Sequence, residues 1–242
     1  MKTIYIGIFH LLFCFTLSNA QNKEIFKTKP GTNGWENLKT EEERFSAMQL
    51  PIDRLEDIST KELLKICLDY PAFGYISAYY DTQMAINILI SKFNGLQELM
   101  GRKDAGMELL NVYRYIDTTG YRIKDFNCEE EFWTLKFMYV ELLLAQDQII
   151  NSLSKSQKKE LLELGMDKIK MKEMSSKFSS LHGVQSSVLI ISRTLNKLDN
   201  LNYQARLSSN VKLEVFNKTG SLDDISILQI IKTECQNYLN SN

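Results

Sequence analysis

The chain has 242 residues, of which 44% are hydrophobic, and its 29 basic and 30 acidic residues give a formal net charge of −1 at pH 7. This length is sufficient for one large domain or two small ones. The near-neutral charge provides no electrostatic field for nucleic acid or an anionic membrane, so we expect no nucleic-acid partner.

The first twenty residues have the features of an export signal. Lys2 gives a positive start, residues 4–17 are apolar, and the tripeptide Ser-Asn-Ala at 18–20 offers small residues to a signal peptidase. We expect cleavage before Gln21 and a mature protein that is periplasmic or secreted. The apolar stretch is shorter than the roughly 20 residues that a membrane-spanning helix needs, so no membrane span is expected.

After the expected signal peptide, residues 21–38 contain several turn-forming residues and predict an irregular lead-in. A single helical domain is expected over 39–242. Capping boxes, in which a Ser or Thr is followed three residues later by Glu or Gln, predict helix starts after Thr40, Ser59 and Ser154.

The distribution of proline favours helix in the rest of the chain, because none of the three prolines follows Pro71 and helix interiors exclude this residue. Residues 72–116 predict three short helices, with Asp104 as the N-cap of the last. The strongest prediction is a helix over 127–152, in which only a narrow strip that includes Glu141 is polar. This helix is expected to be central to the core.

The C-terminal third predicts two further helices and a segment of uncertain type. Lysines between 155 and 177 alternate with acidic residues and are expected on a solvated helix face. Residues 184–198 predict the next helix, whereas the alternation in 208–220 fits a short strand or a loop. Residues 221–224 should cap the last helix.

We therefore expect an all-α fold of antiparallel helical hairpins, stacked as an α-superhelix, with a compact irregular helical bundle as the alternative. The stretches KELLKICLD at 61–69 and KELLELGMD at 159–167 are similar, as stacked hairpins would be. Helical patterning alone also produces such a match.

Few residues outside the expected signal peptide suit metal binding or nucleophilic catalysis. They comprise one histidine, His182, and three dispersed cysteines, Cys67, Cys128 and Cys235. Zinc sites and histidine-assisted nucleophiles need closer partners, so we expect no metal, no cofactor and no identifiable catalytic residue. His182 is expected between two helices, near C-terminal carbonyls. The three thiols are either all free or form one bridge with one thiol left over.

Five aromatic residues cluster within eleven positions: Tyr70, Phe73, Tyr75, Tyr79 and Tyr80. In an exported protein such a cluster can stack on sugars or grip a peptide, so it is the candidate ligand-binding surface. The alternative is that these rings pack between adjacent helices at a corner of the fold.

Several short blocks within residues 35–113 resemble uncharacterised secreted proteins of Bacteroides-type bacteria. The blocks are Trp35, Glu41-Glu42-Glu43-Arg44, Leu50-Pro51, Ile58-Ser59-Thr60, Cys67-Leu68-Asp69-Tyr70-Pro71 and Phe93-Asn94-Gly95-Leu96-Gln97-Glu98-Leu99. The resemblance implies a secreted helical module of unknown role. Larger members carry an Asn-Cys-His-containing region downstream, which this chain lacks, so no catalytic residue is carried over.

The leading functional hypothesis is a non-enzymatic binding or scaffold module outside the cytoplasm, with a carbohydrate or protein ligand. The alternative is a carboxylate-based hydrolase that acts on a cell-surface polymer. Two carboxylates that face each other in a concave pocket would favour the hydrolase, whereas an exposed aromatic groove without them would favour binding.

Overall fold

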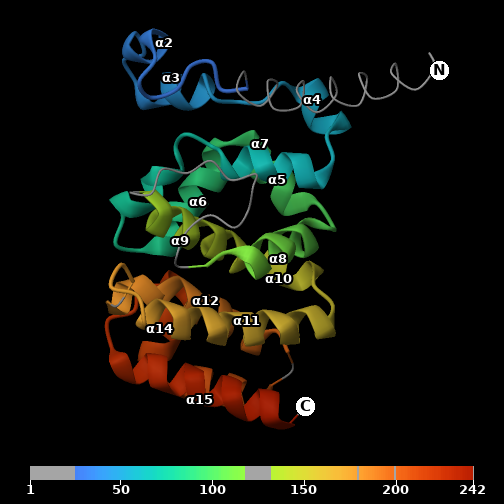
Figure 1. Ribbon diagram of the computed structural model, residues 1–242, viewed down its shortest axis with the longest axis vertical. Helices are drawn as coiled ribbons and strands as arrows, with labels where there is room; N and C mark the ends of the chain where they lie inside the picture. The colour runs from blue at the N-terminus through green and yellow to red at the C-terminus, as the bar shows by residue number, and fades with distance from the viewer. Residues whose placement is uncertain (1–24, 118–131, 179, 199, 242) are drawn as a thin grey trace, which may run out of the picture. The chain divides into compact units, whose positions relative to one another are not determined.

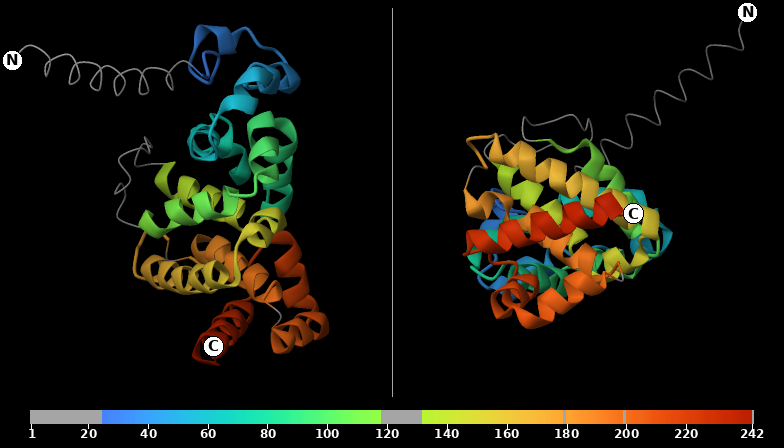
Figure 2. Two further views of the ribbon diagram at one scale, coloured as in Figure 1. Left: turned by 90° about the vertical axis from the view of Figure 1, so that its right-hand side faces the viewer. Right: turned by 90° about the horizontal axis from the view of Figure 1, so that it is seen from below.

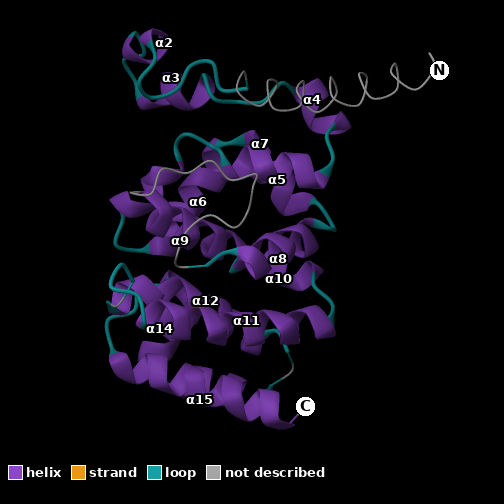
Figure 3. Cartoon of the chain, viewed as in Figure 1, coloured by secondary structure: helices purple, strands orange, loops and turns teal. Residues whose placement is uncertain are grey.

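The computed structural model describes residues 25–117, 132–178, 180–198 and 200–241, and over these ranges the chain is helical, without a β-strand (Figure 3). The expected all-α class is therefore confirmed. The expected export signal and Cys128 lie outside the described residues. Within the described ranges, no helix is both long enough and apolar enough to cross a membrane.

The chain divides into two compact units, residues 1–57 and 58–242. The described helices of the first unit are Asn33–Glu36 (α2), Glu41–Ser46 (α3) and Ile52–Asp57 (α4). Thr40 caps α3 by the expected capping box. Its hydroxyl accepts the Glu43 N–H at 3.1 Å, and the Glu43 carboxylate accepts the Thr40 N–H at 3.0 Å. This unit thus contains the described part of the expected lead-in together with two helices of the expected domain.

The second unit begins with five helical elements, of which the second lies within the Tyr70–Tyr80 segment and the third follows it. They are Thr60–Leu68 (α5), Phe73–Ala78 (η1, a 3₁₀ helix), Thr82–Lys92 (α6), Asn94–Gly101 (α7) and Ala105–Tyr115 (α8). α5 packs against α7 and α8, and α6 packs against η1 and α7. Ser59 caps α5 as expected. Asp104 precedes α8 as expected, but its carboxylate accepts a hydrogen bond from Thr60 Oγ1 at 2.7 Å instead of capping the helix.

Seven helices complete the second unit. They are Trp133–Leu144 (α9), Asp147–Ser152 (α10), Lys155–Glu173 (α11), Leu181–Asn196 (α12), Leu201–Ser209 (α13), Val211–Thr219 (α14) and Ile225–Ser241 (α15). α11 and α12 form a closely packed hairpin, and α12 also packs against α9 and α15. Figure 1 and Figure 2 show the helices of this unit in successive layers, from α5 and α7 at one end, through α8, α9 and α10, to α15 at the other.

The helix expected over 127–152 is two helices in its described part, α9 and α10. Between them Gln146 has an extended backbone, with φ −73° and ψ 139°. Its side-chain Nε2 donates to the Leu142 carbonyl at 2.6 Å, at the end of α9 where carbonyls lack helical partners. Glutamine is a good helix former, so the sequence pattern does not show this break. α9 is nevertheless enclosed, and Trp133 and Phe137 are buried.

The segment expected as a strand or loop at 208–220 contains the helix α14. The Asn210 side chain caps it by accepting the Leu213 N–H at 3.1 Å. Leu213 and Phe216 are buried, three residues apart, whereas Val215 is exposed. The buried positions therefore follow a helical period. The alternation of apolar and polar residues, which fits a strand, does not match the burial of these side chains.

Gly220 ends α14 in the left-handed region, at φ +74°. Glycine adopts this conformation without steric cost. A Cβ at this position would also lie 2.3 Å from Thr82 Oγ1 and 3.0 Å from the Leu189 side chain. The missing side chain thus lets the end of α14 approach α6 and α12 closely, and these three helices border the cleft described below.

Candidate functional site

The core of the second unit holds a carboxylate, Glu141, with no exposed surface. Tyr113 Oη donates to its Oε1 at 2.8 Å, and Lys172 Nζ donates to its Oε2 at 2.5 Å. The hydroxyls of Ser186 and Ser187 donate one further hydrogen bond to each oxygen. A carboxylate has about four acceptor positions, so Glu141 has none left for a ligand. Glu141, which the sequence places on a narrow polar strip, is therefore buried in a cluster that joins α8, α9, α11 and α12.

Lys172 is buried in the same cluster, and Lys168 nearby on α11 is also buried, so the expected solvated face is wrong for these two lysines. Lys172 Nζ lies 4.2 Å from the ring centroid of Phe137, a distance that permits a cation–π contact. Burial lowers the pKa of Lys172 and raises the pKa of Tyr113. Perturbed groups of this kind suggest a catalytic site only when they face a cleft, and none of them lines the clefts described below.

Arg193 of α12 is a further buried charge, and it binds the backbone carbonyls at the ends of two other helices. Its Nε donates to the Asn217 carbonyl at 3.0 Å, and its Nη2 donates to the Asn217 and Lys218 carbonyls at 2.9 and 3.1 Å. Its Nη1 donates to the Ala145 carbonyl at 3.0 Å and to Gln83 Oε1 at 2.5 Å. These carbonyls belong to the C-terminal ends of α9 and α14, where the helix dipole is negative. All five guanidinium donors are therefore used within the fold.

Arg193 lies in the wall of a cleft of about 590 Å³, here called the amide cleft, between α6, α10, α12 and α14. Six of its lining residues are amides: Gln83, Asn87, Gln146, Gln148, Asn196 and Asn217. Gln83 Nε2 donates to Asn87 Oδ1 at 2.7 Å and to Gln146 Oε1 at 2.9 Å, while its own Oε1 accepts from Arg193. These bonds hold one wall of the cleft in a fixed orientation before any ligand binds.

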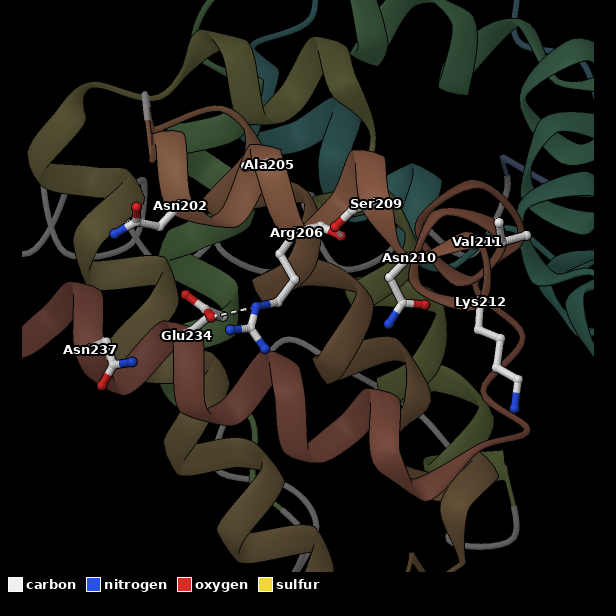
Figure 4. Close-up of a pocket in the computed structure, with 9 residues that line it drawn as sticks. All are labelled: Asn202, Ala205, Arg206, Ser209, Asn210, Val211, Lys212, Glu234 and Asn237. Atoms are coloured by element: carbon white, nitrogen blue, oxygen red, sulfur yellow. Dashed lines mark hydrogen bonds and ion pairs between the residues drawn. The ribbon is translucent and has the colours of Figure 1, made fainter.

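A larger and more open groove of about 1090 Å³ is lined by α13, the start of α14 and α15 (Figure 4). Arg206 extends from α13 toward Glu234 of α15, and its Nε lies 2.9 Å from Glu234 Oε1. Asn210 lines the same groove, and Lys212 Nζ lies 2.7 Å from Asp224 Oδ2. The charges of this groove thus pair with neighbouring residues.

The five aromatic residues expected to form a ligand surface differ in burial. Tyr70 is fully buried, and its ring stacks nearly parallel to Phe93 with 4.1 Å between the centroids. Phe73 is half-buried, 5.9 Å from the ring of Tyr139, with Lys136 Nζ 4.7 Å from its own ring centroid. These two rings therefore contribute to packing at the η1 corner.

The other three aromatic residues differ in exposure. Tyr75 and Tyr79 are half-buried, whereas Tyr80 is exposed and its hydroxyl donates to Asp223, just before α15. None of the five lines the amide cleft or the α13–α15 groove. Tyr80 is therefore exposed to solvent, and none of the five aromatic residues belongs to either of these two clefts.

His182 and two of the cysteines are likewise outside both clefts. His182 is exposed in the first turn of α12, which Ser180 caps, so the expectation of a position near C-terminal carbonyls is wrong. Cys67 and Cys235 are buried free thiols, so these two do not form the bridge left open by the sequence. Burial raises the pKa of Cys235 to about 12, which leaves this thiol unreactive.

The lining of each cleft contains a single carboxylate among the described residues, Asp147 in the amide cleft and Glu234 in the groove. Asp147 Oδ2 lies 3.1 Å from Lys197 Nζ. The described part of the chain contains no group of three His, Cys, Asp or Glu side chains that could hold a metal ion. No protein-family model matches the chain, and comparison with curated proteins and with solved structures finds no significant match.

Proposed function

We propose that this chain is a non-enzymatic binding module that acts outside the cytoplasm and holds a saccharide in the amide cleft. The observation that carries the proposal is the network of Gln83, Gln146 and Arg193, which fixes the cleft wall in advance. An amide side chain donates and accepts hydrogen bonds at once, as a sugar hydroxyl does. Side chains that are already ordered lose little conformational entropy when a ligand binds to them.

The polar lining favours a saccharide over a peptide. Among the described residues that line the cleft only Ile90 and Met100 are apolar, whereas six are amides, so the cleft has few side chains of the type in which peptides usually anchor. The export pattern at 1–20 and the resemblance to secreted helical proteins support a place outside the cytoplasm.

The hydrolase alternative has less support. Glycosidases place two carboxyl groups about 5–9.5 Å apart on either side of the scissile bond. Among the described lining residues, each cleft has one carboxylate, and each of these, Asp147 and Glu234, is paired with a cation.

Binding of the protein to a panel of immobilised saccharides, followed by calorimetric titration of those retained, tests the proposal. Gln148→Ala removes an exposed amide of the amide cleft on α10. Asn151→Ala removes an exposed amide on the same helix outside the cleft and is the matched control. We expect Gln148→Ala to weaken binding at least tenfold and Asn151→Ala to leave it unchanged. Retention of no saccharide, or an equal loss in both variants, would refute the proposed site, and release of shortened chains would favour the hydrolase.

Export is tested separately by the intact mass of protein from an exporting host. We expect a chain that begins at Gln21. A soluble cytoplasmic species that retains residues 1–20 would contradict this part of the proposal.

A further inference from the structure

A second hollow adjoins the amide cleft across α6. This hollow, here called the α6 hollow, has a volume of about 470 Å³, and it shares four lining residues with the amide cleft: Gln83, Asn87, Ser91 and Lys218. The three on α6 are spaced four residues apart, so they form a stripe along one face of the helix. At 1.5 Å per residue the stripe is about 12 Å long, which exceeds the length of one sugar ring. The two hollows together therefore suit a ligand longer than a monosaccharide.

The α6 hollow differs from the amide cleft by a pair of apolar side chains. Met84 and Ile88 line it from positions four residues apart on α6, and neither lines the amide cleft. Met84 is 51% exposed, and Ile88 is half-buried. Asn87 follows Met84 at a spacing of three residues, so the two side chains are neighbours on the helix surface. The α6 hollow thus presents an amide next to an apolar surface.

Asn87 has a hydrogen-bond donor available for a ligand. Its Oδ1 accepts from Gln83 Nε2 at 2.7 Å, whereas its Nδ2 makes no hydrogen bond to a described residue. The side chain is exposed and lines both hollows. Because Gln83 also binds Gln146, the orientation of the Asn87 amide is set before a ligand arrives. A carbonyl oxygen is a ligand group that accepts from such a donor.

The two hollows have no surplus charge. Asp147 Oδ2 lies 3.1 Å from Lys197 Nζ, and Lys218 is paired within its own helix. Burial lowers the pKa of Arg193, and the charges of Asp147 and Asp81 oppose this shift. Asp81 also caps α6, because its Oδ1 accepts the N–H of Met84 at 2.8 Å. A neutral ligand therefore suits this lining.

We propose that the amide cleft and the α6 hollow together bind a neutral oligosaccharide that carries an acetamido group. This inference rests on the proposed function and specifies its ligand class. An acetamido group joins a carbonyl oxygen to a methyl group. The oxygen accepts from Asn87 Nδ2, and the methyl group contacts Met84 and Ile88. The next sugar ring lies in the amide cleft, where Gln148 and Asn196 bind its hydroxyls.

Calorimetric titration with tri-N-acetylchitotriose and cellotriose isolates the contribution of the acetamido group, since the two trisaccharides differ only at C2 of each ring. We expect tri-N-acetylchitotriose to bind at least tenfold more tightly than cellotriose and than the monosaccharide N-acetylglucosamine. Met84→Gln replaces the apolar contact with a polar side chain of similar length. It should weaken binding of tri-N-acetylchitotriose at least threefold and leave that of cellotriose unchanged. Met107→Gln makes the same change at an exposed position of α8 outside both hollows and should have no effect.

Several outcomes would overturn the inference, and they differ in what they imply for the proposed function. Equal affinity for the two trisaccharides, with both weakened in Gln148→Ala, would exclude the acetamido contact and leave the proposed function intact. The same holds if Met84→Gln affects both trisaccharides equally or neither of them. N-acetylglucosamine that binds as tightly as the trisaccharide would exclude the longer ligand alone. Retention of no saccharide at all would refute both proposals. The comparison of the three sugars uses the unmodified chain, so it decides the inference even if a variant fails to fold.

Discussion

Replacement of Glu141 by leucine tests the buried cluster at the centre of the second unit. The change leaves the ammonium group of Lys172, whose side chain has no exposed surface, without its carboxylate. Loss of one member of a buried ion pair costs about 3–5 kcal/mol. The hydroxyls of Tyr113, Ser186 and Ser187 lose their acceptor as well, at about 1–3 kcal/mol for each group left unsatisfied. We therefore expect a loss of more than about 5 kcal/mol, which is comparable to the whole stability of a marginal domain.

Urea denaturation followed by far-ultraviolet circular dichroism measures this loss as a change in the free energy of unfolding. The double variant Glu141→Leu/Lys172→Met removes both charges, so it should be more stable than Glu141→Leu alone by at least about 2 kcal/mol. A cost below about 1 kcal/mol for Glu141→Leu, or a double variant no more stable than the single one, would show that the two side chains do not form a buried pair.

Three further predictions concern buried residues of the same unit. Burial raises the pKa of Tyr113 above its unfolded value of 10.0, so its contribution to stability is complete below pH 10 and is lost as the pH rises above it. Tyr113→Phe should reduce the slope of unfolding free energy against pH in that range by up to about 1.4 kcal/mol per pH unit. Arg193→Lys cannot supply five donors in a planar fork and should cost about 3 kcal/mol in urea denaturation, whereas an unchanged stability would refute the helix-end role. Phe137→Ala should lower stability by about 3–5 kcal/mol and Phe73→Ala by less, because only Phe137 is fully buried; equal melts would contradict this ranking.

The helix starts were the most predictable features because their determinants are local. A capping box involves a side chain and a backbone N–H three residues apart, so a short stretch of sequence contains the whole interaction. The boxes at Thr40, Ser59 and Ser154 all form as expected. Asp104 shows the limit of this reasoning, because a distant residue, Thr60, takes the carboxylate that would otherwise cap α8.

The buried charges could not be predicted because their partners are distant in sequence. Glu141 and Lys172 are 31 residues apart, and each alone has the pattern of a solvated residue. The packing of α9 against α8 and α12, and of α11 against α12, brings the four donors to Glu141. The aromatic cluster shows the converse limit, because Tyr70 and Tyr80 are close in sequence, but Tyr70 is buried and Tyr80 is exposed.

The amide cleft could not be predicted, because the pattern of residues 208–220 indicates a strand or a loop, whereas this segment contains the helix α14. In a strand, alternate residues face opposite sides, so Phe216 and Lys218 would share one face and Asn217 would lie on the other. In the helix α14, Phe216 is buried while Asn217 and Lys218 lie in the last turn, where their carbonyls lack helical partners. Those carbonyls bind Arg193, and the Asn217 side chain then lines the cleft. The helix end therefore both fixes the arginine and presents the asparagine, so the candidate site exists only if this segment is helical.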